Sequence, residues 1–118
     1  MSRTAALLAL LLALIAVGCT PSLSPSEAKG VFAQGSQLLL AHPGGSVDKA
    51  HWPSAISALK PKSLYAAPEG LYICTSRFFV EERGFFVPHP SIPVVATSST
   101  DPSFKPLAAG LFTYLIKS

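Results

Sequence analysis

The chain has 118 residues, enough for one domain with a modest hydrophobic core. Its formal net charge is +3, but the lysines are scattered along the chain rather than clustered. Because nucleic-acid binding needs a dense cationic surface, this pattern argues against a DNA or RNA partner.

The first segment of the chain has the pattern of an export signal. Arg3 is the only charged residue before Cys19, and the run between them is strongly apolar. The apolar run is about 13 residues long, which suits the core of a signal peptide and is too short for a membrane-spanning helix. Two small residues, Ala16 and Gly18, stand just before Cys19, as a signal peptidase requires.

Residues 1–19 therefore resemble the signal peptide and lipobox of a bacterial lipoprotein. The resemblance implies removal of residues 1–18 and attachment of diacylglyceryl and N-acyl lipid to Cys19. Two or more acyl chains anchor a protein stably, so no further membrane-binding element is required. Thr20, rather than an aspartate, follows the cysteine, and by resemblance this favours the outer membrane, facing the periplasm, over the inner membrane. An ordinary signal peptide cleaved near Gly18 is the alternative.

Processing at this cysteine would leave about 100 residues, one domain's worth. Residues 19–26, rich in Pro and Ser, are expected to form a lipidated N-terminus and tether. Residues 27–118 are expected to form a single small globular domain. With Cys19 lipidated, Cys74 has no cysteine partner, so we expect no intramolecular disulfide and no cofactor beyond the covalent lipid.

The first half of this domain is predicted to be helical. Ser24 can cap a helix, Pro25 suits its first position, and Glu27 can complete a capping box. The helix should end near Ala41. A second, short helix should follow Trp52-Pro53. The apolar residues on one face of the first helix are Ala28, Val31, Phe32, Leu38 and Leu39.

The second half is predicted to consist of strands. Residues 63–67 and 71–77 are expected to pair as a hairpin around a Pro-Glu-Gly turn. Two Phe-Phe-Val triplets, residues 78–80 and 85–87, are expected to flank a second turn formed by Glu81–Gly84.

The remaining residues are predicted to be one long loop and a last strand. Residues 89–106 are rich in Pro and Ser, and residues 111–116 form an apolar run. The elements together predict an α+β fold. One or two N-terminal helices would pack on a small antiparallel sheet of three or four strands.

The sequence offers one candidate nucleophile, Cys74. A reactive cysteine needs a thiolate, stabilised by a histidine or a helix N-terminus, and His42, His51 or His89 would have to approach it. Its apolar neighbours in a strand favour a buried, inert thiol. The three histidines also lack the spacing of a metal site, so we expect neither catalytic residues nor a metal.

Glu81 and Glu82 are adjacent, so on a strand they would point to opposite faces and could not act as a general acid and base. At a hairpin turn both carboxylates would be solvated and have ordinary pKa values. The sequence therefore predicts a solvated turn here rather than a catalytic pair.

The two Phe-Phe-Val triplets do not alternate between apolar and polar residues, so both faces of each strand need cover. A helix on one face and the Pro-rich loop on the other would bury them. The competing hypothesis is an exposed aromatic patch that contacts a partner, and its candidate residues are Phe79, Phe86 and Arg83. Because lipid would already anchor the chain, such a patch fits a protein contact better than a membrane contact.

These features predict a lipid-anchored envelope protein that is a non-enzymatic binding or accessory module, with an inhibitor-like or immunity-like role as one version. Its expected partners are the membrane, through the anchor, and an envelope protein or small ligand. Two alternatives stay open. One is a small enzyme that uses Cys74 with a histidine, and the other is a purely structural envelope lipoprotein.

Overall fold

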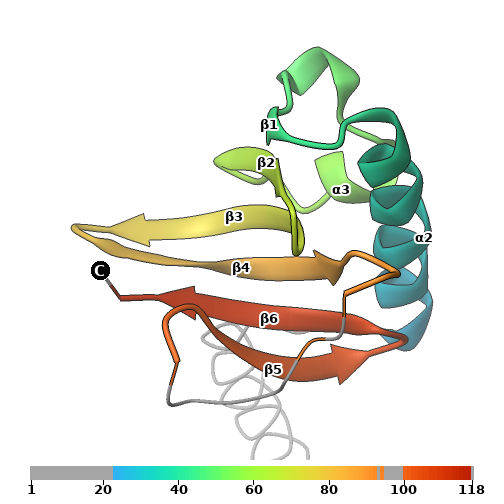
Figure 1. Cartoon of the computed structure of the whole chain (residues 1–118). Coiled ribbons are helices and arrows are strands. Elements are labelled where there is room, and N and C mark those ends of the chain that lie inside the picture. The colour runs from blue at the N-terminus through green and yellow to red at the C-terminus, as the bar shows by residue number, and fades with distance from the viewer. Residues whose placement is uncertain (1–22, 93, 95–99, 118) are drawn as a thin grey trace, which may run out of the picture.

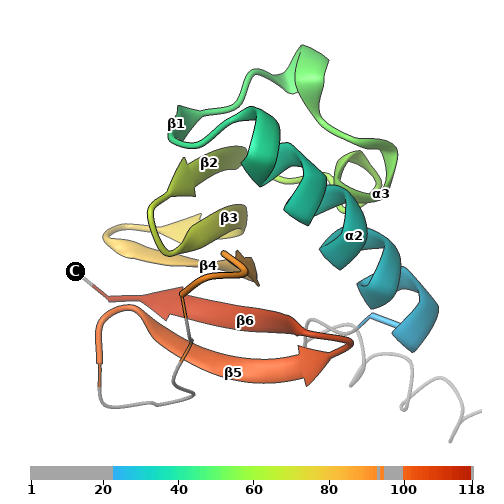
Figure 2. The same cartoon turned by 45° about the vertical axis from the view of Figure 1, so that its right-hand side comes forward.

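One long helix lies across one face of an antiparallel sheet (Figures 1 and 2). The computed structural model describes residues 23–92, 94 and 100–117. Among these, six strands form one sheet in the order β1-β2-β3-β4-β6-β5. The helices are α2 (Pro25–Ala41), η1 (Lys49–His51) and α3 (Ser54–Ser57), and the strands are β1 (Gly45–Ser46), β2 (Ser63–Ala67), β3 (Gly70–Phe78), β4 (Glu81–Pro88), β5 (Ser103–Ala108) and β6 (Leu111–Ile116).

Helix α2 begins and ends where the sequence predicts. The Ser24 side chain accepts a hydrogen bond from the Glu27 amide at 3.2 Å, and the Ser24 amide donates to Glu27 Oε1 at 3.1 Å. This capping box is confirmed, with Pro25 at the first helical position. Helix α3, which follows Pro53, is confirmed as the predicted second helix.

The α+β class is correct, but the prediction of three or four strands is wrong. The two additional strands are the edge strands β1, which is only two residues long, and β5. Strand β5 begins inside the segment predicted to be a loop, residues 89–106, and ends two residues beyond it, and it contains Pro106. An edge strand tolerates proline because one side of its backbone has no partner to bond.

The second hairpin is present, but its predicted turn is wrong. The chain reverses at Phe79-Val80, and Glu81–Gly84 belong to β4, where Glu82 pairs with Arg77. Gly84 is glycine for another reason: a Cβ there would collide with the Ile73 carbonyl oxygen next to the β-bulge of β3. A glycine within a strand often marks a bulge or a close approach of two backbones, and here it marks both.

Apolar side chains cover both faces of the sheet. On the face that α2 covers, one cluster joins α2 with β2, β3 and β4. On the opposite face lies a smaller, mostly aromatic cluster, which includes Val94 from the predicted loop. The first cluster includes Val31, Leu38, Ile56, Leu64, Leu71, Ile73, Phe85 and Val87. The second is centred on Tyr72, Phe86 and Tyr114, with Tyr65, Phe104 and Phe112 packed against them.

In the part of the chain that the structure describes, no helix is long and apolar enough to cross a membrane. Cys19 and the predicted signal peptide lie outside the described residues. The lipoprotein assignment therefore stays a prediction.

Candidate functional site

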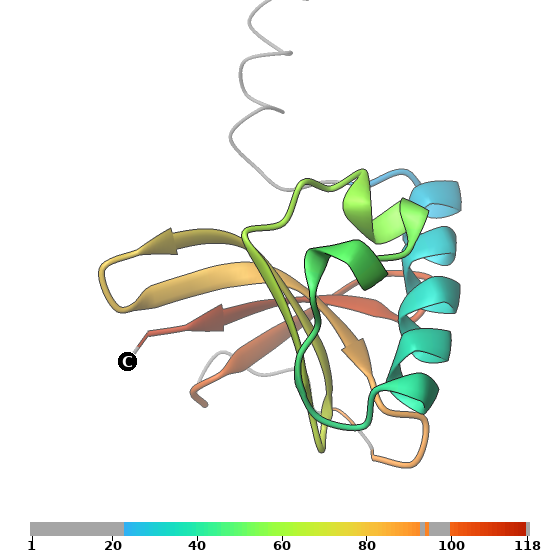
Figure 3. The same ribbon diagram turned by 90° about the horizontal axis from the view of Figure 1, so that it is seen from above.

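The β3–β4 hairpin extends beyond the strands on either side of it. Strand β2 pairs with β3 only as far as Cys74, and β6 pairs with β4 only as far as Glu82. The last residues, from Phe78 to Glu81, pair only with each other. Figures 1 and 3 show this end of the hairpin pointing away from α2. We call Phe78, Phe79 and Val80 the hairpin tip.

The hairpin tip is apolar and exposed. Its three residues have 69%, 87% and 65% of their surface accessible, in chain order. The rings of Phe78 and Phe79 meet edge to face with their centroids 4.5 Å apart, so they present one continuous apolar surface. The other exposed large apolar side chains among the described residues, Leu40 and Ile92, are separated from the tip in sequence and from each other.

Phe79 also has an unfavourable backbone conformation. Its φ is 54°, in the left-handed region, which costs a residue with a side chain about 1–2 kcal/mol. Lys60 and Ala109 share this conformation, but Phe79 is bulky and lies at an exposed turn. Strain of this kind persists where the surrounding structure imposes it, and it often marks a functional position.

Four charged side chains form the base of the tip, and their charges balance. Arg77 Nη2 lies 3.0 Å from Glu82 Oε1, and Arg83 Nη2 lies 3.5 Å from Glu81 Oε2. The two arginines are largely exposed. The two glutamates differ, because 42% of the Glu81 side chain is accessible and only 13% of the Glu82 side chain.

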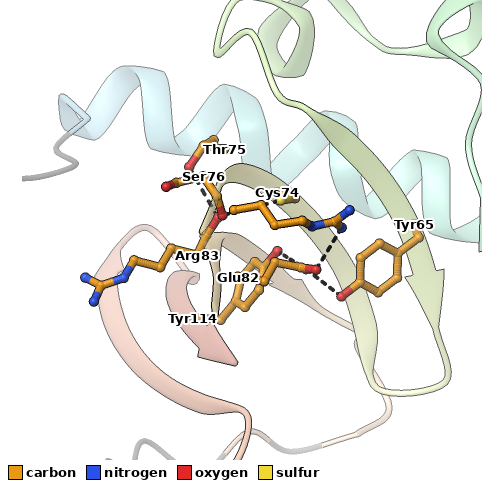
Figure 4. A network of polar contacts seen from close by, with 8 residues as sticks. Tyr65, Cys74, Thr75, Ser76, Glu82, Arg83 and Tyr114 are labelled. Atoms are coloured by element: carbon orange, nitrogen blue, oxygen red, sulfur yellow. Dashed lines mark hydrogen bonds and ion pairs between the residues drawn. The ribbon is translucent and has the colours of Figure 1, made fainter. Parts of the chain in front are cut away.

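Glu82 is the centre of a polar network that joins four strands (Figure 4). Its Oε2 accepts hydrogen bonds from the hydroxyls of Tyr65 in β2, at 2.7 Å, and Tyr114 in β6, at 2.6 Å. Its Oε1 accepts from Arg77 in β3. The expectation that Glu82 is a solvated turn residue is therefore wrong, because β4 turns its side chain toward the aromatic face of the sheet.

The network also shifts the ionisation of its members. Burial raises the pKa of Glu82, but hydrogen bonds from Tyr114, Tyr65 and Arg77 together outweigh this effect and hold it below the ordinary value. The pKa values of Tyr65 and Tyr114 are raised, mainly by burial and secondly by the hydrogen bond that each hydroxyl donates to the Glu82 carboxylate. The hydrogen bonds of the network are therefore strongest when the Glu82 carboxylate is charged and the two tyrosine hydroxyls are neutral.

Phe86, one of the predicted contact residues, is fully buried. Its ring lies 4.8 Å from that of Tyr72 and 4.6 Å from that of Phe104. Its neighbour Phe85 packs on the α2 side. The second triplet is therefore core, whereas the first is exposed, and Phe79 and Arg83 are the predicted contact residues that a partner can reach.

Cys74 is fully buried at the root of the hairpin, and its Sγ lies 3.6 Å from the Ser76 carbonyl oxygen. Within the described ranges, its thiol makes no hydrogen bond to a histidine. The rings of His42 and His51 lie 6.1 Å apart, and His89 is hydrogen-bonded to Ser91. The described residues also contain no group of three or more His, Cys, Asp and Glu able to hold a metal ion.

Comparisons of the chain with protein-family models, curated proteins and solved structures find no match. Function must therefore be inferred from the geometry of the chain itself. Two features are informative: the exposed hairpin tip, and the partly buried network around Glu82 at its base.

Proposed function

We propose that this chain is a lipid-anchored envelope module that acts by binding rather than by catalysis, and that the hairpin tip is its contact. The observation that supports the contact is the run of three exposed apolar side chains at Phe78–Val80. Aromatic side chains are enriched in the centres of protein interfaces, and most other large apolar side chains of the described residues are covered. The lipobox pattern at Cys19 supports the envelope location.

The anchor is tested by replacing Cys19 with serine. Serine has no thiol to accept the diacylglyceryl group, so Cys19→Ser should leave the precursor unprocessed or release the protein from membranes. Cell fractionation and intact-protein mass spectrometry measure both outcomes. Normal processing with unchanged membrane retention would contradict the anchor.

The contact is tested by Phe79→Asp. Because Phe79 is exposed, we expect this variant to lose its cross-linked complexes in native membranes while its thermal unfolding changes little. Phe86→Asp is the contrasting variant. It places a charge in the aromatic cluster and should unfold the domain, since an unpaired buried charge is strongly destabilising. If Phe79→Asp retains all its complexes, the tip is not the contact.

A further inference from the structure

Hydrogen bonds at the base of the hairpin tip restrict its orientation. The Glu82 carboxylate accepts hydrogen bonds from residues of three other strands, Tyr65, Tyr114 and Arg77. Glu82 is the second residue of β4 and directly follows Glu81, where the turn ends. On the opposite strand, Thr75 Oγ1 lies 3.5 Å from the Arg83 carbonyl oxygen, across the bulge (Figure 4). Phe79, within the turn, has a left-handed conformation. Fixing a contact in its bound geometry increases affinity because less flexibility is lost on binding.

The charges around the tip favour a partner surface that carries no compensating charge. Each arginine at the base has a glutamate of the same hairpin as its ion-pair partner. A partner therefore need not supply a compensating charge, and its contact surface can be apolar with a neutral polar rim. An interface with an aromatic centre and a wet polar rim has this composition.

Two other occupants fit the tip less well. Glu81 directly follows Val80, so inserting the tip to acyl depth in a bilayer would draw an ion pair out of water, which is costly. A second copy is also disfavoured. Two protruding tips would meet convex against convex and leave most of each tip uncovered, whereas a concave pocket can surround one tip and match its shape.

We propose that the hairpin tip is a preorganised plug for a concave apolar pocket in another protein, and that Glu82 is the residue that positions it. This inference rests on the proposed function, because it names the kind of partner that the same tip binds. Glu82 acts through Tyr65, Tyr114 and Arg77 and does not touch the partner itself.

The chain supplies a matched control for Glu82. Glu81 is the same residue type, is adjacent in sequence and also pairs with an arginine, but 42% of its side chain is accessible and it makes no hydrogen bond to a tyrosine. Glu82→Gln should loosen the hairpin, so amide hydrogen exchange across residues 77–81 should rise, whereas Glu81→Gln should leave it unchanged. Tyr114→Phe, which removes one hydrogen bond to Glu82, should have a smaller effect in the same direction.

Binding is tested in the full-length protein with a photoreactive benzoyl-phenylalanine at position 79, cross-linked in native membranes. The same probe at Leu40, which is also exposed but lies on α2, measures random contact. We expect the probe at position 79 to form an adduct with a protein. Excess wild-type chain should compete with the probe and reduce this adduct, whereas excess Val80→Asp chain should not. If Glu82→Gln leaves roughly 10–30% of hairpins in the binding geometry, its adduct should fall about three- to tenfold, since apparent affinity scales with that fraction. Glu81→Gln should have no effect.

The remaining outcomes separate the two proposals. An adduct to phospholipid would overturn the protein pocket while leaving the tip as a contact. An adduct no stronger than that from Leu40 would overturn the proposed function as well. Unchanged hydrogen exchange and cross-linking in a folded Glu82→Gln variant would show that Glu82 does not position the tip.

Discussion

Glu81 and Glu82 show how one position along a strand changes the role of a side chain. Successive residues of a strand point to opposite faces, so Glu81 faces water and Glu82 faces the aromatic cluster. A carboxylate on an aromatic face is stable only when its charge is paired and hydrogen-bonded, and Tyr65, Tyr114 and Arg77 provide those bonds. The same strand thus provides one solvated carboxylate and one structural carboxylate.

Sequence reasoning predicted the polar contacts that are local and missed those that are distant. The capping box joins Ser24 to Glu27, three residues apart, and its pattern can be recognised from the sequence. The tyrosines that bond Glu82 are 17 and 32 residues away from it. Their convergence depends on strand order and register, which the sequence of a single chain does not specify.

Cys74 provides a test at this scale. Because its thiol is fully buried, we expect a small maleimide to alkylate it slowly in the native protein and rapidly after denaturation. Mass spectrometry of timed reactions measures the rate, and denatured protein is the control for an accessible thiol. Rapid alkylation of the native chain at neutral pH would instead support the alternative in which Cys74 acts with a histidine.

The elements were predicted most accurately where capping and turn residues fix their ends. Helix α2 and the turn between β2 and β3 have such signals, and both agree with the structure. The β3–β4 turn has no glycine, asparagine or proline at its centre, so Phe79-Val80 gave no turn signal, whereas Glu81–Gly84 appeared to give one. A turn that lacks the residues that favour it is one that the sequence alone does not predict.

Two glycines of α2 should respond in opposite ways to a methyl group. At Gly35 a Cβ would lie 2.8 Å from Val87 Cγ2, in the tightly packed layer between helix and sheet. We expect Gly35→Ala to destabilise the fold, since overpacking costs about 1–3 kcal/mol and alanine recovers at most about 1 kcal/mol of helix propensity. Urea unfolding measures the difference.

Gly30 is the matched control. A Cβ added there would meet only Ala55 Cβ, at 3.7 Å, which is an ordinary contact. Gly30→Ala should therefore stabilise the protein by about 0.5–1 kcal/mol through helix propensity alone. Equal stabilisation by both alanines would show that Gly35 does not set the spacing between α2 and the sheet.

At the scale of the whole molecule, the Glu82 network should limit stability at acidic pH. A carboxyl whose pKa is lower in the folded state adds stability above its unfolded value, near 4.5, and loses it as the pH falls through the folded value. We expect Glu82→Gln to lower the free energy of unfolding by about 1–3 kcal/mol at neutral pH, as expected for hydrogen bonds to a charged group. The variant should also lose less stability between neutral and acidic pH.

Urea unfolding at pH 7 and at pH 3 measures this difference. Glu27, whose pKa is also lowered, is present in both proteins, so its contribution cancels in the comparison. The tyrosines act at the other end of the range: because their pKa values are raised in the folded state, stability should fall as the pH rises beyond their ordinary value of 10.0. Identical acid dependence in the wild type and Glu82→Gln would contradict the role of the network.

The α+β class could be predicted because helical and strand periodicities divide the chain into two halves. The strand count could not, because β1 and β5 have little apolar pattern of their own. Strand β1 contains only Gly45 and Ser46, and it becomes a strand by pairing with Ala66 and Tyr65. Pairing between distant segments, rather than local propensity, defines such edge strands.

The two edge strands affect how readily the sheet can pair with a sheet of a neighbouring molecule. A sheet grows into fibrils when an exposed edge offers a row of free backbone groups to another chain. Here one edge is only two residues long, and the other contains Pro106, which has no backbone N–H to donate. Neither edge is therefore a good template for a further strand. Chains concentrated side by side on a surface would resist amyloid-like growth while the hairpin tip stays free.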